Sequence, residues 1–251
     1  MIKLVFFSEI IYRSLHYLFL TLSCLMNVIT RRFNMDKIYT FSPSEFAFGH
    51  AGCKRCYYDQ KVNGIKVSVP FPSVFSKLDI LQKNFYHDKS SDILGANIQP
   101  GTIKTDYAKI QKSKVLEDNK GRKLQLKGKI DAYVDHEDFY SIIDFKVTNI
   151  NEQKIDTYAT QLLSYALMFE QPEQGHLKLD PIKNLGIFCF EPDTMVDYQN
   201  SPNFKMKTKY YDIKKDNQKM FSFITDVIDL LEGQAPASDQ KCSICKVRGL
   251  I

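Results

Sequence analysis

The sequence predicts an α/β fold in which a central mixed β-sheet is flanked by helices. Residues 124–147 alternate apolar and polar side chains, which is the period of β-strands. The segments before and after them repeat apolar residues at helical spacing. With 251 residues, 44% of them hydrophobic and 25% charged, the chain has the composition of one moderately sized globular domain. This composition excludes collagen-like and wholly disordered proteins.

The first 34 residues differ from the rest of the chain. Their apolar run is interrupted by Glu9, Arg13 and His16, which disfavours a membrane-spanning helix. The run also lacks the small-residue cleavage site of a signal peptide. We interpret residues 1–34 as a hydrophobic leader, with three open explanations: a mis-assigned start before Met35, a weak membrane segment or an added amphipathic helix. Residues 35–251 form the predicted domain. The leader holds four basic residues and one acidic residue, so it supplies most of the net charge of +5, and bulk charge does not indicate DNA binding.

Two helices are expected before the sheet. Ser42 and Glu45 form a capping box around a proline, and the helix that they begin should run to about Lys61. Two prolines make residues 67–72 extended. Ser73 is then expected to cap a second helix, whose buried face would comprise Val74, Leu78, Leu81 and Phe85.

The sheet is expected to be built around a hairpin. One strand would carry alternating buried residues from Leu124 to Val134, and a polar turn at residues 136–138 would lead to a partner strand at residues 139–147. The remaining elements follow in order: a helix at Glu152–Glu170, a buried strand at Asn184–Phe190, a more exposed strand at Lys205–Tyr211 and an amphipathic helix at Asn217–Leu231.

The predicted hairpin carries candidate metal ligands. Strand alternation places Asp144 and Lys146 on one face, and a tight hairpin can bring Asp131 beside Asp144. Two adjacent carboxylates repel each other, and a hard divalent cation such as Mg²⁺ relieves that repulsion. The lysine can then orient or help to deprotonate a water that attacks a phosphodiester.

The acid-x-lysine triplet is not specific by itself. The chain contains six such triplets, which begin at Asp59, Asp118, Asp144, Glu152, Asp212 and Asp239. Only Asp144 follows a run of strand-like apolar residues and has a second strand-borne aspartate shortly before it. The competing interpretation is a solvated hairpin face with cross-strand Lys–Asp pairs.

Three motifs in order resemble the PD-(D/E)XK nuclease superfamily, in particular its RecB-like branch with the CRISPR-associated exonucleases. They are Gly128-Lys-Ile-Asp131, Ile142-Ile143-Asp144-Phe145-Lys146 and Gln161-Leu-Leu-Ser-Tyr165. The resemblance implies a restriction-endonuclease-like core in which Asp131 and Asp144 bind metal and Lys146 acts on water. It implies that Gln161 and Tyr165, one helical turn apart, buttress the lysine or touch the DNA backbone. The family often adds an upstream acid or histidine, for which Asp79 and His87 are candidates that we leave outside the predicted catalytic set.

Four of the six cysteines form two CxxC pairs, Cys53/Cys56 and Cys242/Cys245, while Cys24 lies in the leader and Cys189 is expected in the core. The pairs together can form a four-sulphur metal site that joins the two ends of the domain. Disulfides are the competing interpretation, but they are typical of small secreted domains. The resemblance implies a [4Fe–4S] cluster. The division into two early and two late cysteines differs from the family's usual one and three, so Zn²⁺ stays open.

Local charge is more informative than net charge. Residues 101–130 contain nine basic and three acidic residues, and a second lysine cluster lies at residues 205–219. Such clusters near a metal site suit a phosphate backbone, although they are also compatible with a solvated surface.

We therefore predict a cytoplasmic Mg²⁺- or Mn²⁺-dependent deoxyribonuclease that contacts the backbone of single-stranded DNA or duplex ends, in DNA repair, recombination, phage processes or defence. We expect no small-molecule cofactor, and we do not expect a membrane as a partner of the domain, although a weak membrane segment stays open for the leader. The alternative is a catalytically silent nucleic-acid-binding module of the same fold.

Overall fold

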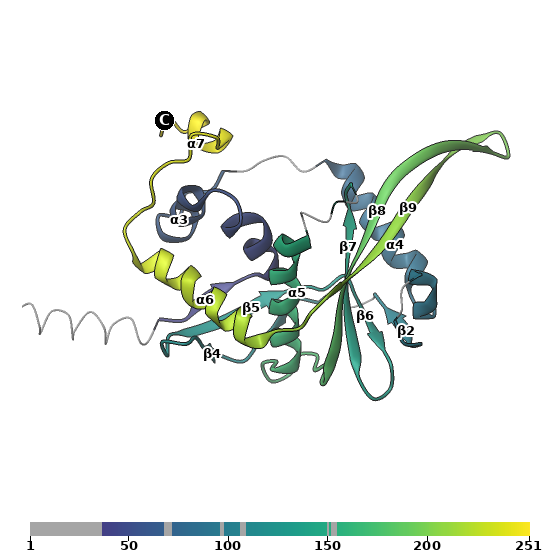
Figure 1. Ribbon diagram of the computed structural model, residues 1–251, viewed down its shortest axis with the longest axis horizontal. Helices are drawn as coiled ribbons and strands as arrows, with labels where there is room; N and C mark the ends of the chain where they lie inside the picture. Colours follow the sequence, from purple (N-terminus) through teal and green to yellow (C-terminus); the bar gives the residue numbers. More distant parts are fainter. Residues whose placement is uncertain (1–36, 68–71, 96–97, 106–108, 150, 152–154) are drawn as a thin grey trace, which may run out of the picture.

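A five-stranded mixed sheet forms the centre of the fold (Figure 1). The computed structural model describes residues 37–251 except 68–71, 96–97, 106–108, 150 and 152–154. The leader therefore lies outside the described residues. The strands follow the order β2 (Thr102–Lys104), β6 (Ala132–Asp135), β7 (Tyr140–Val147), β8 (Ile182–Tyr198) and β9 (Ser201–Ile213). Strands β7 and β8 are parallel and the other pairs are antiparallel, which confirms the predicted mixed sheet.

A second, smaller sheet lies beside the first. It contains β1 (Tyr39–Phe41), β3 (Gln111–Lys112), β4 (Leu116–Glu117) and β5 (Lys123–Gly128). The continuous strand expected from Leu124 to Val134 is therefore wrong, because β5 and β6 belong to different sheets. The chain leaves β5 at Gly128, where an added Cβ would lie 2.9 Å from the Cδ of Pro43. Side-chain alternation continues across the break, so the pattern alone did not reveal it.

Helices cover both faces of the central sheet. The helix α5 (Ile155–Glu170) packs on β7 and β8, and α6 (Asn217–Glu232) packs against α5. On the other side of β7 lies α4 (Ser73–Tyr86) (Figure 1). The alternation along β7 divides the core accordingly, because Ile142 belongs to the α5 side while Ile143 and Phe145 belong to the α4 side.

The first predicted helix is interrupted. The Ser42 capping box is present and begins α2 (Pro43–Glu45), but a π-helical segment η1 (Phe46–His50) follows, and the chain turns before α3 (Lys54–Val62). The interruption allows Cys53 to become the N-cap of α3. The expected single helix to Lys61 is therefore wrong, and most of the extended segment predicted at residues 67–72 lies outside the described residues.

The predicted buried face of the second helix is also wrong. Pro72 rather than Ser73 occupies the N-cap of α4, and Val74, Leu81 and Phe85 are each more than half exposed. Only the C-terminal end of the helix reaches the sheet, where the Tyr86 ring packs against Phe145, Phe188 and Phe190.

The remaining elements agree with the sequence pattern but differ in length. Strand β8 is buried from Leu185 to Phe190, as predicted, and then continues with β9 as a long exposed hairpin beyond the body of the domain (Figure 1). A 3₁₀ turn η2 (Ser91–Leu94) precedes β2, and a short helix α7 (Ser243–Val247) ends the chain. Within the described part of the chain, no helix is long and apolar enough to cross a membrane.

A buried ion network joins the small sheet to α6. The Arg122 guanidinium contacts the Asp118 carboxylate at 2.6 Å and reaches Asp229 and Glu232 of α6 at 2.8 Å each. Burial raises the pKa of Asp118, but its hydrogen bonds with Arg122 outweigh this effect and lower the pKa. The stabilisation is therefore present above the unfolded pKa of about 4 and is lost as the pH falls through the lower folded value.

Replacing Arg122 with leucine is expected to lower the free energy of unfolding by about 3–5 kcal/mol, because Asp118 would stay buried without its partner. Lys120→Gln is the matched control, since it removes a more exposed ion pair with Asp229, of 2.7 Å. That variant should lose about 1 kcal/mol or less. Urea unfolding followed by circular dichroism measures both. Equal losses in the two variants would contradict a special role for the buried network.

Candidate active site and four-cysteine site

The hairpin of β6 and β7 places two aspartates next to each other. Ala132 pairs with Ile143, so Asp131, just before β6, lies beside Asp144 on β7. The backbone N–H of Phe145 donates to Oδ2 of Asp131 at 3.1 Å, which fixes that carboxylate against the strand. Asp144 is buried, with 2% of its surface exposed. The structure thus brings together the two carboxylates that the sequence singled out.

Lys146 lies on the same face of β7 as Asp144. Its Nζ forms an ion pair with Oδ2 of Asp144 and lies 5.3 Å from the ring centre of Tyr158 and 5.6 Å from that of Phe48. Burial lowers the pKa of Lys146, but the Asp144 carboxylate outweighs it and raises that pKa. Burial also raises the pKa of the Asp144 carboxyl, against the effect of Lys146 and with a further contribution from Asp131. The Asp144–Lys146 pair is therefore largely shielded from solvent, and the attraction between its two charges is only weakly screened.

Gln161 and Tyr165 approach this pair from α5. The side-chain amide of Gln161 donates to Oδ1 of Asp144 at 3.2 Å and to the Tyr165 hydroxyl at 3.4 Å. Tyr165 in turn donates to the backbone carbonyl of Lys129 at 2.5 Å. Both side chains are buried. Gln161 thus contacts Asp144 rather than Lys146. Tyr165 holds the backbone at Lys129, two residues before Asp131.

One charged residue of the site was missed from the sequence. Lys83 of α4 forms ion pairs with Oδ1 of Asp131 at 2.8 Å and with Oδ2 of Asp79 at 2.9 Å. In the sequence, Asp79 and Lys83 are spaced as an ordinary pair on a helix surface, so no signal pointed to the sheet. Asp79 therefore meets the site through Lys83, whereas His87 instead pairs with Asp88 at 3.3 Å.

The oxygen donors of this site suit a hard divalent cation. Asp131 and Asp144 supply adjacent carboxylates, and Mg²⁺ is commonly bound by one or two carboxylates with retained waters. The ammonium groups of Lys83 and Lys146 form ion pairs with Asp131 and Asp144 and so partly neutralise the two carboxylates. The buried Oε1 of Gln161 has no hydrogen-bond partner within the described residues. Asp131 and Asp144 are the residues that can hold the cation.

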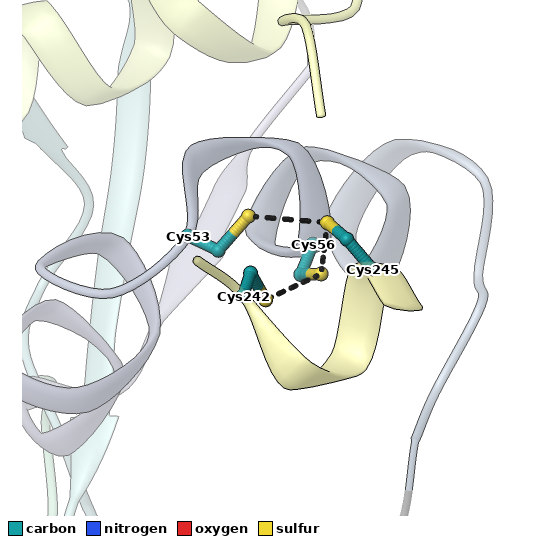
Figure 2. Close-up of side chains that lie close together, drawn as sticks. All are labelled: Cys53, Cys56, Cys242 and Cys245. Carbon is teal, nitrogen blue, oxygen red and sulfur yellow. Dashed lines mark hydrogen bonds between the residues drawn. The ribbon is translucent and has the colours of Figure 1, made fainter. Parts of the chain in front are cut away.

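The two CxxC pairs meet at a second site (Figure 2). Cys53 is the N-cap of α3 and Cys242 is the N-cap of α7, so each pair straddles the first turn of a helix. The Sγ atoms of Cys53 and Cys245 are 3.6 Å apart, those of Cys56 and Cys245 are 3.5 Å apart, and those of Cys56 and Cys242 are 3.8 Å apart. All four sulphurs lie within 4.8 Å of one another. The predicted joining of the two ends of the domain is confirmed.

A buried acid reinforces this junction. Asp59 of α3 is fully buried, and its carboxylate forms ion pairs with Arg55 at 2.9 Å and with Arg248 at 2.8 Å. Because Arg248 lies near the end of the chain, α3 and the chain end are linked by charge as well as by the cysteines. Hydrogen bonding to the backbone of Cys245 lowers the pKa of Cys242 to about 7, which favours its thiolate form. Cys189 is buried in the core, as predicted.

The predicted basic cluster at residues 101–130 is partly neutralised. Four of its members form ion pairs with acids elsewhere in the fold: Lys104, Lys112, Lys120 and Arg122. Arg122 is buried and is not a surface contact. The lysines of β9 are placed by the register of the sheet, in which Lys146 of β7 pairs with Cys189 of β8 and Cys189 pairs with Lys209. Lys205, Lys207 and Lys209 therefore continue the face of the sheet that carries Asp144, although Lys207 also pairs with Asp193 at 2.6 Å.

Comparison with known proteins gives one family match. A family model described as the PD-(D/E)XK nuclease superfamily matches residues 86–250, which include the hairpin, the Gln161 helix and the second cysteine pair. The chain matches none of the curated proteins with which it was compared. Among solved structures it is similar to one described as "Crystal structure of SSO0001", with 16% sequence identity and a TM-score of 0.46, over 91% of this chain and 95% of that chain.

Proposed function

The chain belongs to the PD-(D/E)XK nuclease superfamily, and from this premise we propose that it is a metal-dependent nuclease of the RecB-like type that hydrolyses DNA phosphodiester bonds. The observation that carries the proposal is the convergence of Asp131, Asp144 and Lys146 on one hairpin. Processing of DNA in repair, recombination, phage processes or defence is the setting that this activity suits.

Each residue of the site would have a separate role in hydrolysis. Asp131 and Asp144 would hold Mg²⁺ or Mn²⁺, which when bound stabilises negative charge on the phosphate and lowers the pKa of water. Lys146, fixed by Asp144, would orient the water that attacks phosphorus, while the bond from phosphorus to the leaving sugar oxygen breaks. Gln161 would position Asp144 through its hydrogen bond, and Tyr165 would hold the backbone before Asp131.

The face around the site offers contacts for a phosphate backbone. The lysines of β9 follow the same side of the sheet away from Asp144, at the two-residue spacing of a strand. Backbone contacts of this kind bind nucleic acid without reading its sequence. This placement supports a polynucleotide substrate that crosses the sheet toward the β8–β9 hairpin.

Incubation of the purified chain with single-stranded DNA, duplex DNA and single-stranded RNA tests the proposal. We expect cleavage of DNA with Mg²⁺ or Mn²⁺ and no cleavage with EDTA. Binding of DNA without cleavage under any of these conditions would instead support the catalytically silent module. Cleavage of RNA alone would overturn the proposed substrate while keeping the proposed chemistry.

We also propose that the four cysteines hold a structural metal, and the sulphur spacing favours one Zn²⁺ ion over a [4Fe–4S] cluster. Zinc–sulphur bonds of about 2.3 Å in a tetrahedron separate neighbouring sulphurs by about 3.8 Å. Three of the six sulphur–sulphur separations, of 3.5, 3.6 and 3.8 Å, lie near this value, and all six are within 4.8 Å. A cubane cluster binds each thiolate through a different iron, so its four sulphurs must lie farther apart.

A further inference from the structure

Lys83 places a positive charge on the carboxylate that is proposed to bind metal. Its ammonium group lies 2.8 Å from Oδ1 of Asp131, while the backbone of Phe145 donates to Oδ2 of the same carboxylate. Both oxygens of Asp131 are therefore engaged. A divalent cation that uses Oδ1 must replace the ammonium group there, because two cations at one oxygen repel each other strongly in a partly buried site.

A second acceptor for Lys83 lies within reach on its own helix. Asp79 precedes Lys83 by one turn of α4, and its Oδ2 already lies 2.9 Å from the ammonium group. The side chain of Asp79 is 44% exposed, so it can accept the full charge of Lys83 without further desolvation. Lys83 can thus leave Asp131 by changing side-chain torsions alone, with no movement of the helix.

We propose that Lys83 is an internal counter-cation that occupies Asp131 in the metal-free protein and passes to Asp79 when a divalent cation binds. This inference rests on the proposed metal-dependent function. Lys83 is a positioning residue here, since it acts on the metal through Asp131. Its presence keeps the paired carboxylates of Asp131 and Asp144 compatible with folding before metal arrives, at the expense of metal affinity.

The position of Asp131 does not depend on Lys83. The carboxylate is held by the 3.1 Å hydrogen bond from the backbone N–H of Phe145. The Asp131 backbone directly precedes the β6–β7 ladder, and Tyr165 holds the Lys129 carbonyl two residues earlier. Removing the lysine charge therefore removes a competitor without releasing the ligand. A purely structural role for Lys83 predicts the opposite, a weaker site.

Titration of the purified full chain with Mn²⁺, followed by electron paramagnetic resonance in the absence of nucleic acid, measures this competition. We expect Lys83→Gln to lower the dissociation constant for Mn²⁺ at least about tenfold, because a neighbouring positive charge is lost. Lys83→Arg, which keeps the charge, should stay within about threefold of the unmodified chain. The matched control is Lys120→Gln, which removes an ion-paired lysine on another part of the fold and should change nothing.

Variants of Asp79 distinguish two roles for this residue: an acceptor for the Lys83 ammonium group, or a direct ligand of the metal. We expect Asp79→Asn to raise the Mn²⁺ dissociation constant, because Asp131 is then the remaining ion-pair partner of Lys83 among the described residues. In the double variant with Lys83→Gln, that increase should disappear, since the two residues act through one ammonium group. An increase that persists in the double variant would make Asp79 a ligand and overturn the transfer of Lys83.

The possible outcomes distinguish this inference from the function on which it rests. Equal Mn²⁺ affinity in the Lys83→Gln variant and the unmodified chain, or weaker affinity in the variant, would overturn the counter-cation while leaving the metal site in place. Absence of Mn²⁺ binding in both proteins would overturn the proposed metal site and the inference with it. Binding seen only after Lys83→Gln would support the inference in its strongest form.

Discussion

Asparagine in place of Asp144 is expected to abolish DNA cleavage. The substitution keeps the shape of the side chain and an oxygen that can accept the hydrogen bond from Gln161, but it removes the charge that pairs with Lys146 and binds metal. We expect the cleavage rate to fall at least about a thousandfold, which corresponds to about 4 kcal/mol of lost transition-state stabilisation. Release of a labelled oligonucleotide, measured with Mg²⁺ and with Mn²⁺, gives the rate.

The matched control for this variant is Asp138→Asn. Asp138 is an exposed acid in the turn of the same hairpin, where its backbone N–H donates to the carbonyl of His136, and it has no contact with the site. Cleavage by this control should stay within about twofold of the unmodified chain, as is usual for surface substitutions. Thermal unfolding of both variants shows whether the domain stays folded. If Asp144→Asn keeps more than a tenth of the activity, Asp144 is not a catalytic ligand.

Local patterns predicted the central hairpin and its acids. Alternation along residues 139–147 fixed which side chains share a face, and the short turn after Asp135 restricted where Asp131 could lie. The same reasoning placed Gln161 and Tyr165 on one side of α5. Each of these inferences uses neighbours within one strand, one helix or one tight turn, where backbone geometry determines direction.

Contacts between distant segments were not predictable in the same way. Lys83 meets Asp131 across 48 positions, and its partner on the helix made it resemble a solvated surface residue. Arg122 was counted with a basic surface because its acidic partners on α6 follow it by more than 100 residues. The division between β5 and β6 was hidden because the buried positions keep their alternation through the break. In each case the deciding interaction is tertiary and leaves no periodic signal.

The four cysteines are an instructive exception to this limit. Cys53 and Cys245 are separated by 192 positions, yet their meeting was predicted. The chemistry of the residues supplied the long-range information, because two isolated CxxC pairs each lack the ligands for a tetrahedral site and complete one another. Paired lysines and aspartates have many alternative partners in this chain, and their chemistry is therefore much less selective.

Serine in place of Cys245 is expected to weaken the attachment of the end of the chain to α3. Cys245 is fully buried, and its sulphur lies within 3.6 Å of two of the other three. Because metal bound only by the folded state contributes its binding energy to stability, loss of a ligand should lower the thermal midpoint by several degrees or more. Elemental analysis should show one zinc per chain before the substitution and little or none after it.

Ser243→Ala is the control for this variant. Ser243 lies between the two late cysteines in α7 and is exposed, so its replacement leaves all four thiolates in place. Zinc content and thermal midpoint should be unchanged in the control. Four irons per chain with a visible absorption band after anaerobic purification would overturn the assignment to zinc. Identical metal content in the unmodified chain and Cys245→Ser would overturn the site itself.

The same substitution should also weaken cleavage, because the cysteine site adjoins a wall of the candidate active site. Phe48 of η1 lies over the Lys146 ammonium group, and only a short turn connects η1 to Cys53. Freeing α3 from α7 would loosen η1 and expose Lys146 to water, which weakens its interaction with Asp144. We expect a partial loss of cleavage activity in Cys245→Ser, smaller than the loss in Asp144→Asn. Recovery of that activity at temperatures well below the new thermal midpoint would show that the cysteines act through the stability of this wall.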